Sequence, residues 1–108
     1  MKRTTFVHDG EILTLFQDQC GTWCCPVCGS IELTDMPYYP GGGASFDICH
    51  SCNFEFGYDD DPLASGTISG INNNWLKWRL RLLEGVALDP ARRQTLLDQL
   101  GNIEIYVF

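Results

Sequence analysis

The length, composition and charge of this chain exclude several classes of protein. Hydrophobic residues make up 44% and aromatic residues 12% of its 108 residues, which is enough apolar material for a packed core and excludes a disordered protein. The formal net charge of −7 disfavours nucleic-acid binding, because that binding depends on basic surface. A chain of this length predicts a single domain over residues 1–108.

The sequence shows no signal of export or of membrane insertion. It contains no run of about 18 apolar residues, and its first residues do not resemble a signal peptide. We therefore expect a soluble, cytoplasmic protein. Six cysteines in that compartment favour a metal site, with a disulfide framework as the alternative.

The first half of the chain is expected to form short strands. Residues 12–16 carry four apolar side chains after a candidate helix cap at Asp9, a pattern that fits a short helix or a strand, and we favour a strand. Residues 31–36 and 45–48 also have the composition of strands, and a turn rich in proline and glycine separates them at 37–43.

Two helices are expected after a linker at residues 59–70. The first spans residues 75–84, with a capping asparagine at 72–74 and Gly85 as a left-handed residue after its last turn. Its apolar arc should contain Trp75, Leu76, Trp78, Leu80, Leu82 and Leu83.

The second helix is bounded by Asp89 as N-cap, Pro90 at its first position and Gly101 after its last leucine. The alternating apolar residues from Ile103 to Phe108 then predict a terminal strand. The buried stripe of this helix should consist of Leu96, Leu97 and Leu100.

Three large side chains of the first helix need particular surroundings. Trp75 and Trp78 stand at helical spacing beside leucines, which favours a core position over a place in an interface. Arg79 falls within the apolar arc, where a charge requires a partner or must extend outward. We predict that its partner is a carboxylate from residues 55–61.

Four of the six cysteines form two C-x-x-C pairs separated by 20 residues, which is the spacing of a zinc site. Two such knuckles can direct four thiolates at one tetrahedral ion, and Gly29 and Asn53 tolerate the positive φ that each turn requires. Four protein ligands leave no open coordination position, which favours a structural role over a catalytic one. The predicted zinc ligands are Cys25, Cys28, Cys49 and Cys52.

The other side chains with metal-binding capacity are given lesser roles. Cys24 could compete with its neighbour as a ligand, whereas Cys20 is expected to be a small buried residue. His8 and His50 are expected at the surface or beside the site rather than as ligands. The acidic run at 59–61 lacks the spacing of a calcium loop and is expected to form a solvated turn.

These elements together predict an α+β fold. A zinc ribbon at about residues 20–60 would carry its two cysteine knuckles on short antiparallel β-hairpins. A helical part at about residues 72–108 would follow, with two short helices and the terminal strand.

About half of the chain resembles a family of small bacterial zinc-ribbon proteins, the cysteine-rich CPCC-like type. The resemblance rests on CPVCG at 25–29, SFDIC at 45–49 and CNFEFGYDDD at 52–61. Departures from the usual pattern occur at 24–26 and at His50, where proline is usual. The resemblance implies a zinc-stabilised fold, and some proteins of this type are found beside toxin genes.

We expect a non-enzymatic zinc protein that binds a basic protein partner, in its sharpest form an immunity-type inhibitor of a basic toxin. Residues 1–71 carry ten acidic and two basic side chains, which would attract such a partner. The alternatives are a rubredoxin-like iron electron carrier and a nucleic-acid-binding zinc ribbon. Nucleic-acid contacts would have to come from Arg79, Arg81, Arg92 and Arg93.

Overall fold

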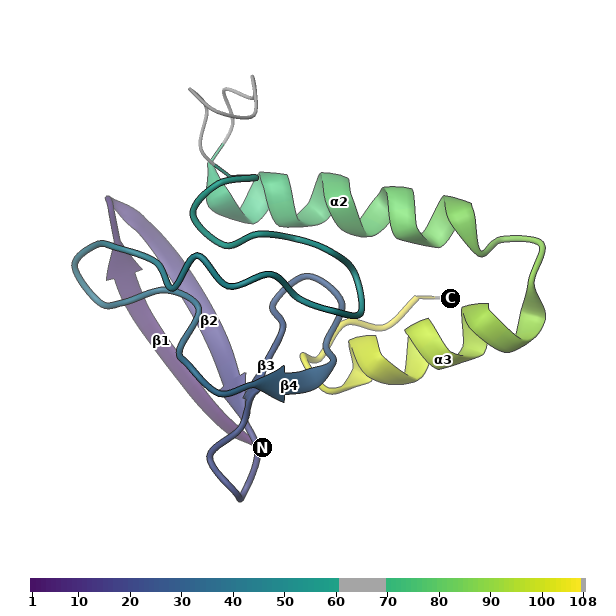
Figure 1. Cartoon of the computed structure of the whole chain (residues 1–108), viewed down its shortest axis with the longest axis horizontal. Coiled ribbons are helices and arrows are strands. Elements are labelled where there is room, and N and C mark those ends of the chain that lie inside the picture. The colour runs from purple at the N-terminus through teal and green to yellow at the C-terminus, as the bar shows by residue number, and fades with distance from the viewer. Residues whose placement is uncertain (61–69, 108) are drawn as a thin grey trace.

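A computed structural model of the chain describes residues 1–60 and 70–107 (Figure 1). Four strands form one antiparallel sheet in the order β1-β2-β3-β4, and two helices follow, so the predicted α+β class is confirmed. Most of the predicted linker at 59–70 lies outside the described residues. The elements are β1 (Lys2–His8), β2 (Glu11–Gln17), β3 (Trp23–Cys24), β4 (Ile31–Leu33), α2 (Ile71–Gly85) and α3 (Pro90–Gly101).

The longest part of the sheet is the hairpin of β1 and β2, which pair along their full length. The turn residues Asp9 and Gly10 have φ values of 48° and 79°, and positive φ at both positions matches the twist of a tight two-residue hairpin. β2 confirms the strand favoured from sequence. β1 was not predicted, because its polar side chains mask the alternation of a half-buried strand.

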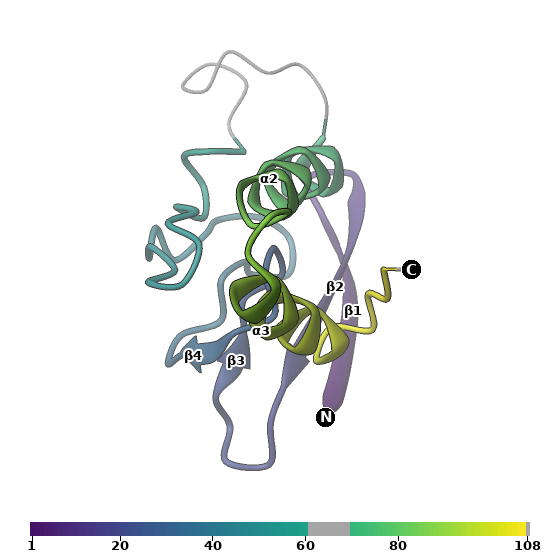
Figure 2. The ribbon, with the colours of Figure 1, turned by 90° about the vertical axis from the view of Figure 1, so that its right-hand side faces the viewer.

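The core lies between this hairpin, the loops that carry the cysteines, and the helices. In Figure 1, α2 runs from the hairpin across the cysteine loops, and Figure 2 shows α3 below α2. Leu13 and Leu15 of β2 are fully buried in the core. Trp75 is also buried, and its indole N–H donates to the hydroxyl of Tyr38 over 3.1 Å, which confirms its core position.

α2 begins earlier than predicted and is capped from a distant part of the chain. Its N-cap is Gly70, not one of the asparagines. The carboxylate of Glu11 accepts from the backbone N–H groups of Ile71 (2.8 Å) and Asn72 (2.9 Å), which otherwise lack partners at a helix start. Gly85 is the last helical residue and does not take the predicted left-handed conformation.

α3 has the boundaries that its local sequence predicts. Asp89 is the N-cap and its carboxylate accepts from the backbone N–H of Arg92 over 3.1 Å, and Pro90 is the first helical residue. Leu96 and Leu100 are buried, as predicted. Within the described parts of the chain, neither helix is long and apolar enough to cross a bilayer.

Residues 103–107 do not form the predicted strand, and the last residue lies outside the described part. The N–H of Ile105 bonds to the carbonyl of Leu100 (3.0 Å), and the N–H of Glu104 bonds to that of Gly101 (3.2 Å). Glu104 has a φ of 60°, so these bonds form a Schellman motif that ends α3 and reverses the chain.

The predicted strands of the ribbon are shorter than expected or absent. Of residues 31–36, only those of β4 are in a strand. Residues 45–48 form no strand, because Phe46 has a left-handed backbone with a φ of 59°. A single antiparallel bridge between Ile48 and Glu55 is the sheet pairing around the second knuckle.

Candidate metal centre

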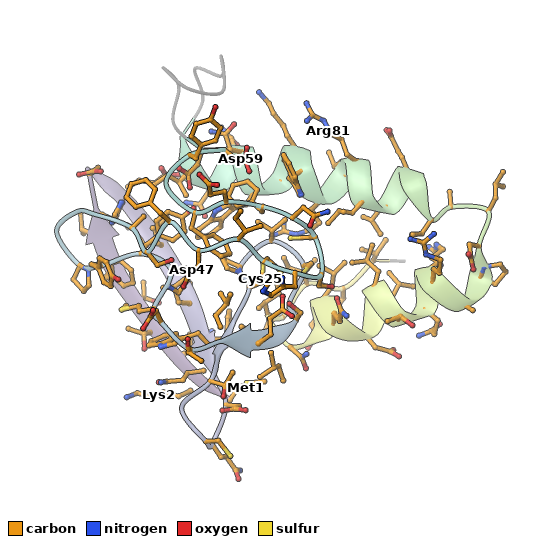
Figure 3. All side chains as sticks on the ribbon, in the orientation of Figure 1. Met1, Lys2, Cys25, Asp47, Asp59 and Arg81 are labelled. Carbon is orange, nitrogen blue, oxygen red and sulfur yellow. The ribbon has the colours of Figure 1, made fainter. Side chains whose placement is uncertain are left out.

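Four cysteine side chains from two loops meet in the interior of the protein. Their Sγ atoms all lie within 4.8 Å of one another, and all four residues are buried. The Cys25–Cys52 and Cys28–Cys49 sulfur pairs are each 3.7 Å apart. Figure 3 shows Cys25 near the centre of the molecule, between the hairpin and the helices.

These separations fit a metal ion bound by four thiolates. Metal–sulfur bonds of about 2.3 Å in a tetrahedron place the sulfur atoms about 3.8 Å apart. A disulfide would require about 2.05 Å, and all six cysteines are free thiols in the structure, so the alternative of a disulfide framework is wrong. The cluster could therefore hold a metal ion.

The two C-x-x-C segments form turns with the same hydrogen bonds. The N–H of Gly29 donates to the carbonyl of Cys25 over 2.8 Å, and the N–H of Asn53 donates to that of Cys49 over 2.7 Å. Gly29 and Asn53 have φ values of 84° and 65°, which confirms the predicted positive φ after each pair. The N–H of Val27 also points at the Cys25 sulfur, 3.4 Å away.

The supports of the two knuckles differ. Cys25 follows β3 directly and β4 begins soon after Cys28, so the first knuckle closes an antiparallel hairpin as predicted. The second knuckle has only the bridge between Ile48 and Glu55 at its base. The α+β class and the cluster are thus established, and the assignment to the zinc-ribbon fold stays a prediction.

Successive residues of α2 contact the two knuckles. The indole N–H of Trp78 donates to the carbonyl of Cys52 over 2.9 Å. Arg79 donates from Nε to the carbonyl of Val27 and from Nη2 to that of Pro26, each over 2.8 Å. One turn of α2 therefore joins the loops that supply the four sulfurs.

The partners of Arg79 correct the sequence prediction. We predicted a carboxylate from residues 55–61, but the guanidinium instead donates to carbonyl oxygens of the first knuckle. Burial lowers the pKa of Arg79, and the negative charges of the Cys25, Cys28 and Cys52 thiolates oppose that shift. The sequence could not reveal this contact, because backbone carbonyls carry no residue-type signal.

The end of α3 lies directly against the first knuckle. A Cβ atom on Gly29 would fall 1.9 Å from the carbonyl oxygen of Gln99. The side-chain amide of Asn102 donates to the carbonyl of Gly29 over 3.0 Å, and Gln99 Oε1 accepts from the Ser51 hydroxyl in the second knuckle over 3.3 Å. The C-terminal end of α3 therefore contacts both knuckles.

The pKa of each thiol in the cluster depends on the other three. Hydrogen bonds from the Cys25 thiol lower the pKa of Cys28 and Cys49. Burial raises the pKa of Cys25 well above its usual value, and hydrogen bonds to the other sulfurs add to the rise. The pKa of Cys52 is also raised: its hydrogen bond with Cys25 lowers it, but those with Cys28 and Cys49 outweigh that effect. A divalent cation would stabilise all four thiolates together.

Glu32 is a neighbour of the cluster that the sequence did not reveal. Its Oε1 accepts from the N–H of Ser51 (3.1 Å) and from the thiol of Cys49 (2.9 Å). Partial burial, followed by the hydrogen bond with Cys49, raises the pKa of this carboxyl. Glu32 thus ties β4 to the second knuckle.

The remaining cysteines and histidines lie outside the cluster. Cys24 is buried elsewhere, and Cys20 is exposed in the loop after β2, contrary to the prediction of a buried residue. His50 is exposed within the second knuckle. His8 is buried in β1 and its Nδ1 lies 2.8 Å from the carbonyl oxygen of Tyr39, so this side chain supports the loop beside the hairpin.

The acidic run at 59–61 is not a fully solvated turn. Asp60 is buried, and its carboxylate accepts from the hydroxyl of Tyr38 and from the N–H of Gly57 (3.3 Å). The carboxylate of Asp59 accepts from the N–H of Glu55 over 2.8 Å, and the third residue lies outside the described part. Charge runs are usually solvated, so this burial could not be predicted from the residues alone.

The chain has a partial match among known proteins. No protein-family profile and no solved structure matches it. A segment of 40 residues is 45% identical to a Bacillus subtilis (strain 168) protein with the name "Uncharacterized protein YoaQ". The match covers 36% of this chain and 34% of that relative, so the matched part spans about a third of the relative's length. Membership of the CPCC-like type stays a prediction.

Proposed function

We propose that this chain is a non-enzymatic protein in which one structural zinc ion supports a surface that binds another protein. The observation that carries the proposal is the closed set of four buried sulfurs at the separations of a tetrahedral thiolate centre. Soft thiolate ligands select zinc or iron over hard cations, and four protein ligands leave no position for an activated water. The proposed ligands are Cys25, Cys28, Cys49 and Cys52.

Apolar side chains remain exposed among carboxylates beside the second knuckle. Phe46 is 62%, Ile48 48% and Tyr58 50% exposed. Ile48 bridges to Glu55, whose carbonyl accepts from the N–H of Tyr58 over 3.2 Å, so these residues are neighbours. Exposed apolar patches with a polar rim are typical of protein-binding sites. This acidic–apolar surface consists of Phe46, Asp47, Ile48, Glu55, Tyr58 and Asp59.

The charge of the chain favours a basic protein as the partner. Asp47 and Asp59, which Figure 3 labels, lie on the loops on either side of the second knuckle. The net charge is −7, and a zinc ion with four thiolates would add two further negative charges. Long-range attraction would speed association with a basic partner, as expected for an immunity-type inhibitor of a basic toxin.

The metal part of the proposal is tested by elemental analysis of the purified protein. We expect one zinc ion per chain in the wild type and in a Cys20→Ser control, because the Cys20 thiol is exposed and outside the cluster. Cys49→Ser should lose the ion or bind it far more weakly. A red protein with stoichiometric iron would replace this proposal with the electron-carrier alternative, and a wild type without metal would refute both.

The binding part is tested by affinity capture from the cells that make the protein, followed by measurement with the purified partner. We expect a basic protein, and raising the salt from about 50 to 200 mM should weaken the complex several-fold. Phe46→Asn should weaken binding roughly tenfold, since asparagine tolerates the left-handed backbone of Phe46. Leu80→Ser is the control, because Leu80 is 50% exposed on α2, outside this surface. Equal effects of both variants, or indifference to salt, would refute this surface.

A further inference from the structure

Arg79 is held in one place by the first knuckle. Its Nε and Nη2 atoms donate to the carbonyls of Val27 and Pro26, which are the two residues between Cys25 and Cys28. A guanidinium group has rigid, planar donors, so two bonds of 2.8 Å fix both its position and its orientation. The same two bonds fix the turn that carries the two cysteines.

The guanidinium also places a positive charge near the four thiolates of the cluster. Four thiolates exceed the charge of a divalent ion by two, and burial keeps water from screening that excess. Because the guanidinium bonds to the carbonyls of Pro26 and Val27, its charge lies beside the turn that carries Cys25 and Cys28. Among the described residues, the arginine that forms an ion pair with a carboxylate is Arg3, not Arg79.

We propose that Arg79 is a positioning residue of the metal centre, which locks the first knuckle in its ligating turn and offsets the excess negative charge of the bound thiolates. This inference rests on the proposed zinc site. It assigns to α2 a role in metal retention: Trp78 bonds to the second knuckle and Arg79 to the first, so one helical turn holds both knuckles in place around the ion.

The experiment measures the rate at which a coloured chelator takes zinc from the full-length, zinc-loaded protein. Arg79→Gln removes the charge and the two-pronged donor, and release should accelerate about 10- to 100-fold, as for other residues that support metal ligands. Arg79→Lys keeps the charge and one donor, and it should restore part of the retention. Arg81→Gln is the matched control, because Arg81 is exposed on the same helix and points away from the molecule (Figure 3).

A spectrum separates the charge effect from a general loss of stability. In cobalt-substituted protein, Arg79→Gln should move the sulfur-to-cobalt charge-transfer band to longer wavelength, because thiolates without a nearby cation give up an electron more easily. The band of Arg79→Lys should stay near that of the wild type. Arg79→Lys retains the charge and should fold, so its release rate tests the donor geometry even where Arg79→Gln is unstable.

The outcomes separate this inference from the proposed function. Equal release rates for Arg79→Gln, Arg79→Lys and Arg81→Gln would overturn the role of Arg79 and leave the zinc site intact. An unshifted cobalt band in Arg79→Gln would overturn the charge role. A wild-type protein without zinc would overturn the proposed function itself.

Discussion

At the scale of single residues, Gly29 shows how tightly the candidate centre is enclosed. Its φ of 84° favours glycine, and the carbonyl of Gln99 occupies the space where a side chain would begin. Gly10 has a similar φ of 79°, but a Cβ atom there would meet nothing within 4 Å. A comparison of the two glycines therefore distinguishes the cost of a positive φ from the cost of a steric clash.

Alanine substitutions at these two positions should differ in cost. Gly10→Ala should lower the free energy of unfolding by about 1–2 kcal/mol, through the left-handed backbone alone. Gly29→Ala should cost roughly 1–3 kcal/mol more, because α3 must move away from the knuckle. Urea denaturation of the metal-loaded variants measures both values. Equal costs would show that α3 does not rest on the knuckle.

The two cysteines outside the cluster should differ in reactivity. Cys20 is exposed, whereas burial, with a contribution from the charge of Asp18, raises the pKa of Cys24 to about 11. At pH 8 only roughly one Cys24 side chain in a thousand is then a thiolate, which is the reactive form. Iodoacetamide should label the metal-loaded protein once, at Cys20, as peptide mass spectrometry would show. Labelling of Cys25 before a chelator is added would contradict the closed centre.

At the scale of elements, the sequence predicted those that depend on neighbouring residues. Asp89 and Pro90 start α3 through local capping, and Gly29 and Asn53 supply the turns of the knuckles. The prediction of a terminal strand was wrong, because Glu104 takes a left-handed conformation that no residue preference favours. Elements with clear capping and turn residues were predictable, whereas this chain reversal, which lacks such a residue, was not.

The same division applies to the candidate site. The C-x-x-C spacing predicted which sulfurs meet, because each knuckle is a local turn and a metal ion requires two of them. The supports of the cluster come from other elements: Glu32 from β4 and Arg79 from α2. Their contacts depend on how β4 and the helices pack against the cysteine loops, which local sequence patterns do not reveal.

The start of α2 depends on a carboxylate that lies 60 residues earlier than Ile71. Glu11→Gln should therefore lower the free energy of unfolding by about 1 kcal/mol, since one acceptor and the charge at the helix N-terminus are lost. Glu84→Gln, an exposed change in the last turn of α2, should be neutral or slightly stabilising, because a carboxylate there opposes the helix dipole. Urea denaturation followed by circular dichroism at 222 nm compares them. Equal destabilisation would refute the cap.

At the scale of the whole molecule, the cysteine cluster joins loops and helices that are not held together by long paired strands. The first knuckle belongs to the β3–β4 hairpin, the second lies beside a single bridge, and both helices bond to these loops. A structural zinc ion contributes on the order of 10 kcal/mol to folding, which is comparable to the total stability of a domain. The ion would therefore stabilise the fold as a whole.

Acid should release the metal and unfold the protein in the same transition. In the cluster without metal, hydrogen bonds, chiefly with Cys25, lower the pKa of Cys49 below that of a thiol in an unfolded chain. Such a group stabilises the folded state above the unfolded pKa, and the contribution is lost as the pH falls through the folded pKa. Protons also compete with zinc for the thiolates, so the zinc released from the protein and the ellipticity should change together as the pH falls. A protein that keeps its near-ultraviolet circular dichroism after losing zinc would contradict this coupling.

The order of the residues along the chain also decides which parts of the metal centre are synthesised first. All four sulfurs come from residues 25–52, whereas the helices that enclose them begin at residue 71. During synthesis the knuckles leave the ribosome first, so they can receive an ion from a cellular donor while one side is still uncovered. In the finished fold the backbone of Gln99 rests on Gly29 and all four cysteines are buried. Nascent chains would then exchange a bound ion faster than finished ones.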